Sequence, residues 1–258
     1  MEKISAIILT KNEELNIERA IKSLKDLADE IIVIDSGSTD RTVDIATSLG
    51  AKVYFRQLDS FANQRNFGIE KSSYDWILMM DADEEVSQEL KLSIKQELLN
   101  PKCKVYEIPR RTYYLGKFLK HTWYPEWRLR LFRKGVLRFE GDLHESPVFL
   151  DKNVKVARLK GDLYHYSYRN LYHQYIKTVD YAKTMAESYH KNRKKFKFYK
   201  LLLSPFMMFF KNYFLKFGFL DGYRGFLVAM SSFFYTFLKY LFLYELELKE
   251  KYKDKLWK

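Results

Sequence analysis

The sequence predicts an α/β domain with a mostly parallel sheet, followed by a helical extension. Short apolar runs alternate with segments of helical periodicity through residues 1–100, at roughly 20–30 residues for each strand and helix. The runs contain no alternating polar residues, as expected for strands that helices cover on both faces. From Asn170 onward the pattern is helical. A chain of 258 residues is long enough for one full core with an appendage.

The spacing of the apolar residues gives the order of the elements. Unbroken apolar runs predict strands at residues 4–9, 31–34, 53–55 and 76–80. We expect the first helix to begin at Asn12, with acidic residues in its first turn, and to run to Asp29. Gly50 follows the second helix, as a glycine beyond a helix end commonly does. The later helices are expected at residues 42–49, 61–71 and 88–99.

Polar loops follow three of these strands, at residues 10–14, 35–40 and 81–85. The carboxyl ends of parallel strands share one edge of the sheet, where α/β proteins bind ligands. In the third loop one small residue separates Asp81 from Asp83, and two carboxylates there suit a hard divalent cation that also contacts phosphate. The alternative is an acidic turn that merely ends the strand.

The neighbouring sequence limits the kind of site. Glu84 and Glu85 are expected to be charges at the start of the next helix. No glycine-rich dinucleotide motif or P-loop follows any of the strands, so neither kind of site is expected.

Residues 101–169 continue the domain with a less regular pattern. A strand is expected at 105–108 and an alternating strand at 128–133. Trp123 and Trp127 lie between them, and each is suited either to core packing or to stacking on a sugar ring. The expected domains are residues 1–169, made of the halves 1–100 and 101–169, and a helical extension, 170–258.

Positive charge is concentrated at the end of the chain, whose net charge is +12. Residues 191–258 hold 15 Lys and Arg against 5 Asp and Glu, whereas the first 190 residues hold 30 against 28. Such asymmetry indicates a partner that is anionic, either nucleic acid or a membrane surface.

The apolar segments of this basic region, residues 201–210 and 225–238, are free of charge. Both are shorter than the ~20 residues that a spanning helix needs, so we expect neither to cross a membrane. They suit either a membrane interface or packing against the first domain or a partner subunit. The lone Cys103 fits a reducing compartment, and the apolar run at the N-terminus is too short for a signal peptide.

Four motifs follow one another along the first part of the chain: Ile7-Ile8-Leu9-Thr10-Lys11-Asn12-Glu13-Glu14, Ile34-Asp35-Ser36-Gly37-Ser38-Thr39-Asp40, Arg65-Asn66-Phe67-Gly68 and Met80-Asp81-Ala82-Asp83. They resemble the motifs of the family 2 glycosyltransferases, whose fold is called GT-A. Later segments resemble the bacterial lipopolysaccharide core β-1,4-glucosyltransferase branch. These are Tyr124-Pro125-Glu126-Trp127-Arg128-Leu129-Arg130-Leu131-Phe132-Arg133, Leu143-His144-Glu145, His165-Tyr166-Ser167-Tyr168 and Gly218-Phe219-Leu220-Asp221-Gly222.

This resemblance implies an inverting glycosyltransferase that moves a sugar, glucose in that branch, from a nucleotide-sugar donor, usually a UDP-sugar, to a lipid-linked acceptor. Among lipid-linked acceptors, we expect lipopolysaccharide core. The enzyme is expected in the cytoplasm, peripheral at the inner membrane, where the basic C-terminal region would suit anionic lipid; no nucleic-acid partner is expected. The alternatives are transfer to a polyprenyl phosphate or a protein, and a non-catalytic protein that binds nucleotide or lipid.

The resemblance also implies roles for single residues. A divalent cation, Mg²⁺ or Mn²⁺, would be held by Asp83, with Asp81 and His165 as further ligands. Glu145 is expected to be the general base, with Glu126 as the competing candidate. Many family members have two consecutive aspartates where this chain has Asp35 and Ser36, so uridine specificity is less secure than nucleotide binding. The expected nucleotide-binding residues are Thr10, Asn12, Glu14, Asp35, Ser36, Arg65 and Asp81.

Overall fold

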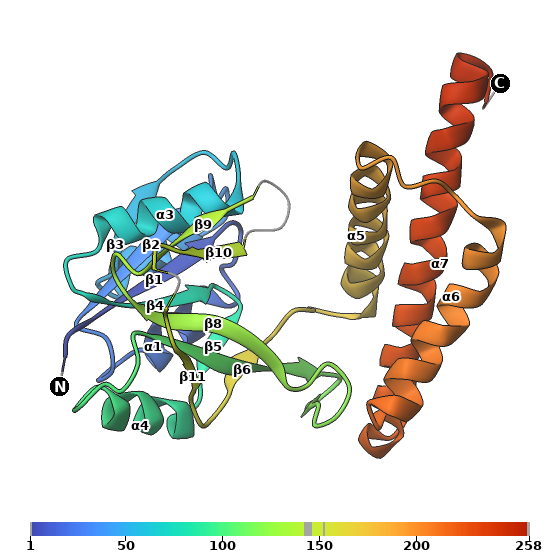
Figure 1. Cartoon of the computed structure of the whole chain (residues 1–258). Helices are drawn as coiled ribbons and strands as arrows, with labels where there is room; N and C mark the ends of the chain where they lie inside the picture. Colours follow the sequence, from blue (N-terminus) through green and yellow to red (C-terminus); the bar gives the residue numbers. More distant parts are fainter. Residues whose placement is uncertain (1, 142–145, 152, 257–258) are drawn as a thin grey trace. The chain divides into compact units, whose positions relative to one another are not determined.

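The computed structural model describes residues 2–141, 146–151 and 153–256 (Figure 1). The chain forms two compact units. The α/β unit comprises Met1–Arg111 and Pro125–Tyr166, and the helical unit comprises Thr112–Tyr124 and Ser167–Lys258. The segment Thr112–Tyr124, which sequence analysis placed in the first domain, therefore clusters with the C-terminal helices.

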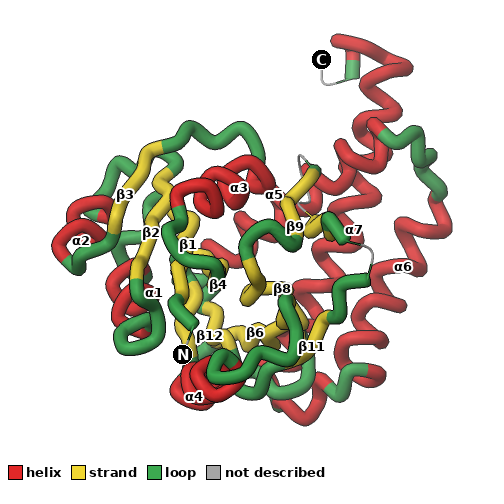
Figure 2. Tube along the Cα trace, turned by 60° about the vertical axis from the view of Figure 1, so that its left-hand side comes forward, coloured by secondary structure: helices red, strands yellow, loops and turns green. Residues whose placement is uncertain are grey.

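The α/β unit is built on a mixed sheet. Its parallel part has the strand order β3-β2-β1-β4, and these four strands lie side by side (Figure 2). The parallel strands are β1 (Ile4–Thr10), β2 (Glu30–Asp35), β3 (Lys52–Phe55) and β4 (Trp76–Asp81). The helices are α1 (Ile17–Ser23), α2 (Thr42–Ser48), α3 (Phe61–Lys71) and α4 (Gln88–Glu97).

Beyond β4 the sheet continues in the order β8-β6-β12-β5, with β8 antiparallel to β4. Strand β11 pairs in parallel with β6, and β9 and β10 form a separate antiparallel pair. These strands are β5 (Glu84–Val86), β6 (Val105–Tyr114), β8 (Glu126–Arg133), β9 (Leu137–Glu140), β10 (Ser146–Phe149), β11 (Val156–Arg158) and β12 (Leu163–His165).

Strands β1, β2 and β4 are buried on both faces, which confirms the α/β prediction, whereas the edge strand β3 is partly exposed. Every residue of β1 is buried, and alternate residues join different clusters. Ile4 and Ile8 belong to the cluster that includes α1 and α4, whereas Ile7 and Leu9 belong to the cluster that includes α3. Helix α3 lies close to the sheet at Gly68, where an added Cβ would come 2.5 Å from Ile7 Cγ2. The absence of polar alternation in the sequence follows from this double covering.

Two predictions about residues at helix starts, for Asn12 and for Glu84 with Glu85, were wrong. Helix α1 begins at Ile17 with Asn16 as its N-cap, whereas Asn12 has a φ of 56° and lies in the loop before it. Helix α4 begins at Gln88, as predicted, but Glu84 and Glu85 are residues of strand β5 and not charges at a helix start.

Two other residues at helix ends have the roles that are usual for their residue types. Ser87 caps α4 by accepting a hydrogen bond from the backbone N–H of Leu90 at 3.2 Å. The prediction for Gly50 is confirmed, since its φ is 83° just beyond α2.

Glu30 stabilises the end of the sheet opposite to the polar loops. It is buried and accepts hydrogen bonds from Ser5 Oγ at 2.5 Å, Ser73 Oγ at 2.9 Å and Lys52 Nζ at 2.9 Å. Burial alone would raise the pKa of Glu30, but these hydrogen bonds outweigh it and lower the pKa from 4.5 to about 2. Because the folded-state pKa is depressed, the stabilisation is complete above pH 4.5 and is lost as the pH falls toward 2.

We therefore expect Glu30→Gln to lower the free energy of unfolding at pH 7 by on the order of 3 kcal/mol. Urea unfolding of both proteins at pH 7 and at successively lower pH measures the difference, which should shrink with acidification. A difference that stays constant with pH would show that the ionised carboxylate is not its source.

The helical unit contains three long helices: α5 (Leu171–Lys191), α6 (Phe198–Phe210) and α7 (Tyr223–Tyr252). Helix α6 continues into the π-helix η1 (Lys211–Leu215), and short 3₁₀ helices, η2 (Gly218–Asp221) and η3 (Lys253–Lys255), precede and follow α7. Helices α5 and α6 both pack on α7.

Polar contacts attach the segment Thr112–Tyr124 to these helices. The carboxylate of Asp221 accepts hydrogen bonds from the backbone N–H groups of Lys120, His121 and Thr122 at 2.9–3.1 Å. Asp221 in the Gly218–Gly222 motif is therefore a structural residue of the helical unit.

Helix α7 is the one described helix that is long and apolar enough to cross a membrane by length and composition, and 33% of its apolar stretch is buried within the protein. The prediction from residues 225–238 counted only the charge-free run. The helix does not stop at Lys239 and extends over 30 residues.

Candidate functional site

The register of the parallel strands brings three predicted site residues together. Thr10 of β1 lies opposite Asp35 of β2, and Leu9 lies opposite Asp81 of β4. The buried hydroxyl of Thr10 has no hydrogen-bond partner within the described part of the chain. A buried polar group without a partner is costly, so this edge of the sheet offers a hydroxyl to a ligand.

The loops after β1 and β2 are linked to each other by side-chain hydrogen bonds. The side-chain Oδ1 of Asn12 accepts a hydrogen bond from the backbone N–H of Thr39 at 2.8 Å, and the backbone N–H of Asn12 donates to Ser38 Oγ at 2.8 Å. The N–H of Glu14 donates to Asp40 at 3.2 Å. In this structure Asn12 and Glu14 therefore hold together the loops that follow β1 and β2. We call this edge of the sheet, where β1, β2 and β4 end, the rim.

Asp35 and Ser36 are also engaged within the rim. Asp35 is buried, and its Oδ2 accepts from the N–H groups of Gly37 and Ser38 at 2.9 and 3.0 Å. Ser36 Oγ accepts a hydrogen bond from Gln64 Nε2 at 3.2 Å. The motif that follows β2 is thus held in one conformation by its own side chains.

Two buried arginines hold the carboxylate of Asp81. Arg65 Nη2 lies 3.2 Å from Oδ1, and Arg130 Nη2 lies 2.6 Å from Oδ2. Burial alone would raise the pKa of Asp81, but the charges of Arg130 and Arg65 outweigh it and hold the pKa well below its usual range. Asp81 is therefore an ionised carboxylate whose position the arginines fix.

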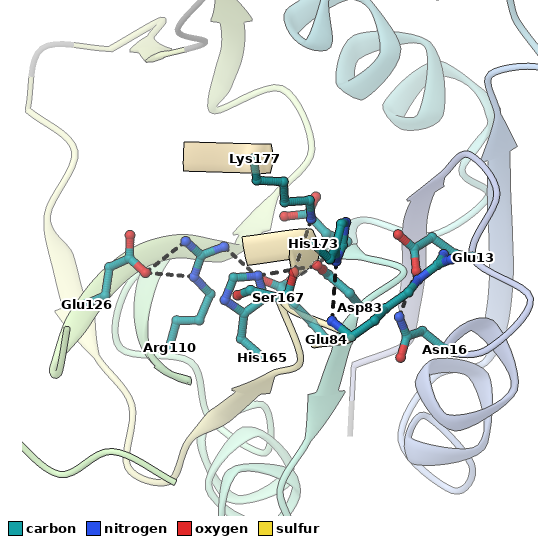
Figure 3. A network of polar contacts seen from close by, with 12 residues as sticks. Glu13, Asn16, Asp83, Glu84, Arg110, Glu126, His165, Ser167, His173 and Lys177 are labelled. Carbon is teal, nitrogen blue, oxygen red and sulfur yellow. Dashed lines mark hydrogen bonds and ion pairs between the residues drawn. The ribbon is translucent and has the colours of Figure 1, made fainter. Parts of the chain in front are cut away.

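Glu84 connects Asp81 and Arg130 to Arg110, a role that the sequence did not reveal. Its side chain is 0% exposed. Oε2 accepts from the N–H of Asp81 at 2.9 Å, and Oε1 lies 2.6 Å from Arg130 Nη2 and 3.4 Å from Arg110 Nη1. Arg110 in turn lies 2.7 Å from Glu126 (Figure 3). Opposite charges therefore alternate from Asp81 through to Glu126.

Asp83 and His165 meet at the edge between β5 and β12. These strands are antiparallel, with His165 opposite Glu84, and the N–H of Tyr166 donates to the backbone carbonyl of Asp83 at 2.9 Å. This pairing places His165 Nε2 3.4 Å from Asp83 Oδ2 (Figure 3). The structure thus brings together two of the three predicted metal ligands.

This donor set fits a divalent cation that is partly held by a substrate. Over the described ranges, no group of three His, Cys, Asp or Glu side chains could by itself hold a metal ion. Mg²⁺ and similar cations keep several waters and are commonly held by one or two protein groups plus substrate phosphates. Asp83 and His165 suit such a site, whereas Asp81 is already paired with arginines.

The two candidate bases are Glu145 and Glu126. Glu145 and His144 lie outside the described residues. Glu126 of β8 is paired with Arg110 and Arg128. Burial alone would raise the pKa of Glu126, but the two arginine charges lower it, which weakens Glu126 as a proton acceptor.

Asn66 is a second residue whose role the sequence did not reveal. Its side chain accepts from the N–H of Phe139 at 2.9 Å and donates to the Phe139 carbonyl at 2.9 Å. Asn66 therefore fixes β9, the strand that precedes the Leu143-His144-Glu145 motif.

A cavity of about 860 Å³ opens beside Asp81. Five of its lining residues are arginines, and its aromatic and aliphatic lining includes Trp127. The arginines are Arg65, Arg110, Arg128, Arg130 and Arg158. Such a cavity suits an anionic ligand that also presents an apolar face.

The two tryptophans have different environments. The guanidinium of Arg158 lies 4.3 Å from the Trp127 ring at the cavity wall. Trp123 packs against Tyr114 and Tyr168 in the helical unit, with ring centroids 6.1 Å apart in both pairs. Core packing therefore accounts for Trp123, while Trp127 faces the cavity.

Comparison with known proteins places the chain in a family. The model of Glycosyl transferase family 2 matches residues 5–150. An uncharacterized glycosyltransferase of Rickettsia typhi is 35% identical over 263 residues, which cover 97% of this chain and 90% of that protein. The lipopolysaccharide core biosynthesis glycosyltransferase LpsC of Rhizobium meliloti is 31% identical over 252 residues, covering 94% and 92%.

A solved structure overlaps a smaller part. Glucosyl-3-phosphoglycerate synthase of Mycobacterium tuberculosis, in complex with Mn²⁺, UDP and phosphoglyceric acid, is 28% identical with a TM-score of 0.36, covering 45% of this chain and 44% of that one. The family match spans more than half of the chain, and both relatives match nearly all of it. The chain therefore belongs to glycosyl transferase family 2, and it is a glycosyltransferase with the GT-A fold.

Proposed function

We propose that this protein is an inverting, metal-dependent enzyme that moves glucose from a UDP-sugar to a lipid-linked acceptor, lipopolysaccharide core. The observation that carries the proposal is the meeting of Asp83 and His165 at 3.4 Å, next to the rim where β1, β2 and β4 end. The name of the Rhizobium relative supports the acceptor class.

On the donor side, the nucleotide lies along the rim and its diphosphate lies near Asp83. The unpartnered hydroxyl of Thr10 and the ordered loops that contain Asn12, Glu14 and Asp35 face the nucleoside. Asp83 and His165 would hold the cation, and Asp81 would remain paired with its arginines at the end of β4. A bound cation would neutralise charge on the leaving diphosphate.

In the reaction, an acceptor hydroxyl oxygen attacks the anomeric carbon from the face opposite to UDP. The new carbon–oxygen bond forms as the bond to the diphosphate breaks, and UDP leaves with the bonding electrons. A carboxylate takes the hydroxyl proton. Glu145 is the proposed base, because neighbouring arginines lower the pKa of the competing Glu126.

The acceptor occupies the cavity lined by the five arginines. Phosphate-bearing sugars suit this lining, because arginine binds phosphate with paired hydrogen bonds. Trp127 offers an aromatic wall for a sugar ring. The basic helical unit keeps the enzyme at the cytoplasmic face of the inner membrane, where anionic lipid attracts lysine and arginine.

Labelled UDP-glucose and a set of acceptors test this function. Purified protein should transfer label to truncated lipopolysaccharide core and give a product of inverted anomeric configuration. Transfer of label to a polyprenyl phosphate or a protein instead would assign the acceptor to that class. Absence of transfer from every UDP-sugar to every acceptor would contradict the proposal.

The choice of base predicts a difference between two variants. We expect Glu145→Gln to lower kcat about a thousandfold, as loss of a general base does, without weakening UDP binding. Glu126→Gln should lower kcat far less, because this carboxylate is held by arginines. Steady-state kinetics measures both. The opposite ranking, with the acid limb of the kcat/KM profile below the ordinary glutamate pKa, would assign the base to Glu126.

A further inference from the structure

Lys239 of α7 is a buried lysine without a counter-charge. The residue is 9% exposed, and its ammonium makes no hydrogen bond or ion pair to any residue that the structure describes. Instead it faces the rings of Tyr240, Tyr189 and Tyr235, at 4.9, 5.0 and 5.8 Å from their centroids. Tyrosine rings favour a cation, but they do not offset a whole charge.

Other lysines lie near the same place. Lys194 Nζ lies 4.2 Å from the centroid of the Tyr189 ring, so Lys194 and Lys239 face one ring. Burial lowers the pKa of Lys239, and the positive charges of Lys194 and Lys200 lower it further. These three residues, Lys194, Lys200 and Lys239, form what we call the lysine cluster.

Two acidic side chains of the adjoining helices, Glu247 and Glu250, are engaged elsewhere. Glu247 accepts a hydrogen bond from the N–H of Phe196 at 2.6 Å. Glu250 lies 3.2 Å from His190 Nε2. Neither of these two carboxylates pairs with the lysine cluster, and lysine binds phosphate as a point charge.

An apolar surface continues from Lys200 along α6. Leu203, Met207 and Phe210 follow Lys200 at the spacing of one helix face, and they are 59%, 71% and 52% exposed. Exposed apolar residues beside lysines fit a membrane interface, where acyl chains cover the apolar face. Figure 1 shows α6 and α7 running beside each other in the helical unit.

We propose that the lysine cluster binds the phosphomonoester headgroup of a membrane lipid, whose acyl chains lie against the exposed face of α6. A phosphomonoester carries close to two negative charges near neutral pH, which suits three ammonium groups better than the single charge of a phosphodiester. The inference rests on the membrane association proposed above and adds a headgroup class to it.

Vesicle flotation of the full-length protein tests this site. Phosphatidylcholine vesicles contain either phosphatidic acid or phosphatidylglycerol, in amounts that give equal surface charge. The wild type should prefer phosphatidic acid. Lys239→Met should abolish the preference, with binding to these vesicles about fivefold weaker. Lys194→Met, at an exposed position, should do the same and guards against misfolding of the buried variant.

Lys183→Met, an exposed lysine of α5, is the control of equal charge. It should weaken binding to both vesicles alike and keep the preference. Equal binding of the wild type to both lipids would overturn the site, as would equal effects of the three variants. Displacement by millimolar glycerol phosphate would also overturn it, by assigning the cluster to a soluble phosphate. Sugar transfer to a detergent-solubilised acceptor should persist in Lys239→Met, which separates this site from the proposed catalysis.

Discussion

Replacing Asp83 by alanine is expected to lower kcat/KM for sugar transfer about a thousandfold, ~4 kcal/mol of transition-state stabilisation. The side chain lies 3.4 Å from His165 Nε2, and His165 alone would be a poor site for Mg²⁺ or Mn²⁺, which prefer oxygen ligands. Without the cation, charge on the departing diphosphate would lose its main stabilisation. Initial rates over a range of Mn²⁺ concentrations measure the effect, which excess metal should only partly restore.

Asp75→Asn is the matched control. Asp75 directly precedes β4, at the end of the strand opposite to Asp81, and its exposed carboxylate pairs with Arg133 at 3.1 Å. Its variant should retain nearly full activity. Comparable losses in both variants would point to a damaged fold, and full activity of Asp83→Ala would remove Asp83 from the site.

Glu84→Gln is expected to lower the free energy of unfolding by about 4 kcal/mol, because the change leaves buried arginine charges short of a partner. Glu84 Oε1 lies 2.6 Å from Arg130 and 3.4 Å from Arg110, and Oε2 holds the N–H of Asp81 at 2.9 Å. Urea unfolding gives the loss of stability. The same variant should raise the KM for the donor, since Arg130 would no longer fix Asp81.

A surface pair calibrates this measurement. Glu18 and Lys22 form an i,i+4 ion pair on α1 with both side chains more than half exposed, and such pairs contribute only ~0.3–0.5 kcal/mol. Glu18→Gln should therefore change stability little. If Glu84→Gln were no more destabilising than Glu18→Gln, the alternating charges would not be holding the site together.

Local pattern was enough to predict the parallel strands and one edge of the site. The runs at β1, β2 and β4 are apolar because both faces are covered, so their positions follow from composition alone. Once they are parallel, their carboxyl ends must adjoin, and Thr10 and Asp35 are indeed direct neighbours in the register.

What the sequence could not reveal depends on strand pairing across long separations. Glu84 meets Arg130 only because β4 pairs antiparallel with β8, and nothing in the local spacing indicates that pairing. Asn66 is similar, because its partner Phe139 is 73 residues away. A polar residue in a helix, such as Asn66, or an acidic residue just after a strand, such as Glu84, is usually solvated, so neither position differs in sequence from an ordinary surface residue.

Asn12 shows the limit of capping rules. An asparagine followed by two glutamates favours a helix start, but its side chain is used by Thr39 of the neighbouring loop, and the helix begins after Asn16. The competing bond is tertiary and lies outside any local window.

Isothermal titration of UDP with and without Mn²⁺ tests whether Asp83 and the nucleotide phosphates share one cation. We expect Mn²⁺ to tighten UDP binding to the wild type at least tenfold and Asp83→Ala to lose this coupling. UDP affinity that is equal with and without Mn²⁺ in the wild type would contradict a shared cation site.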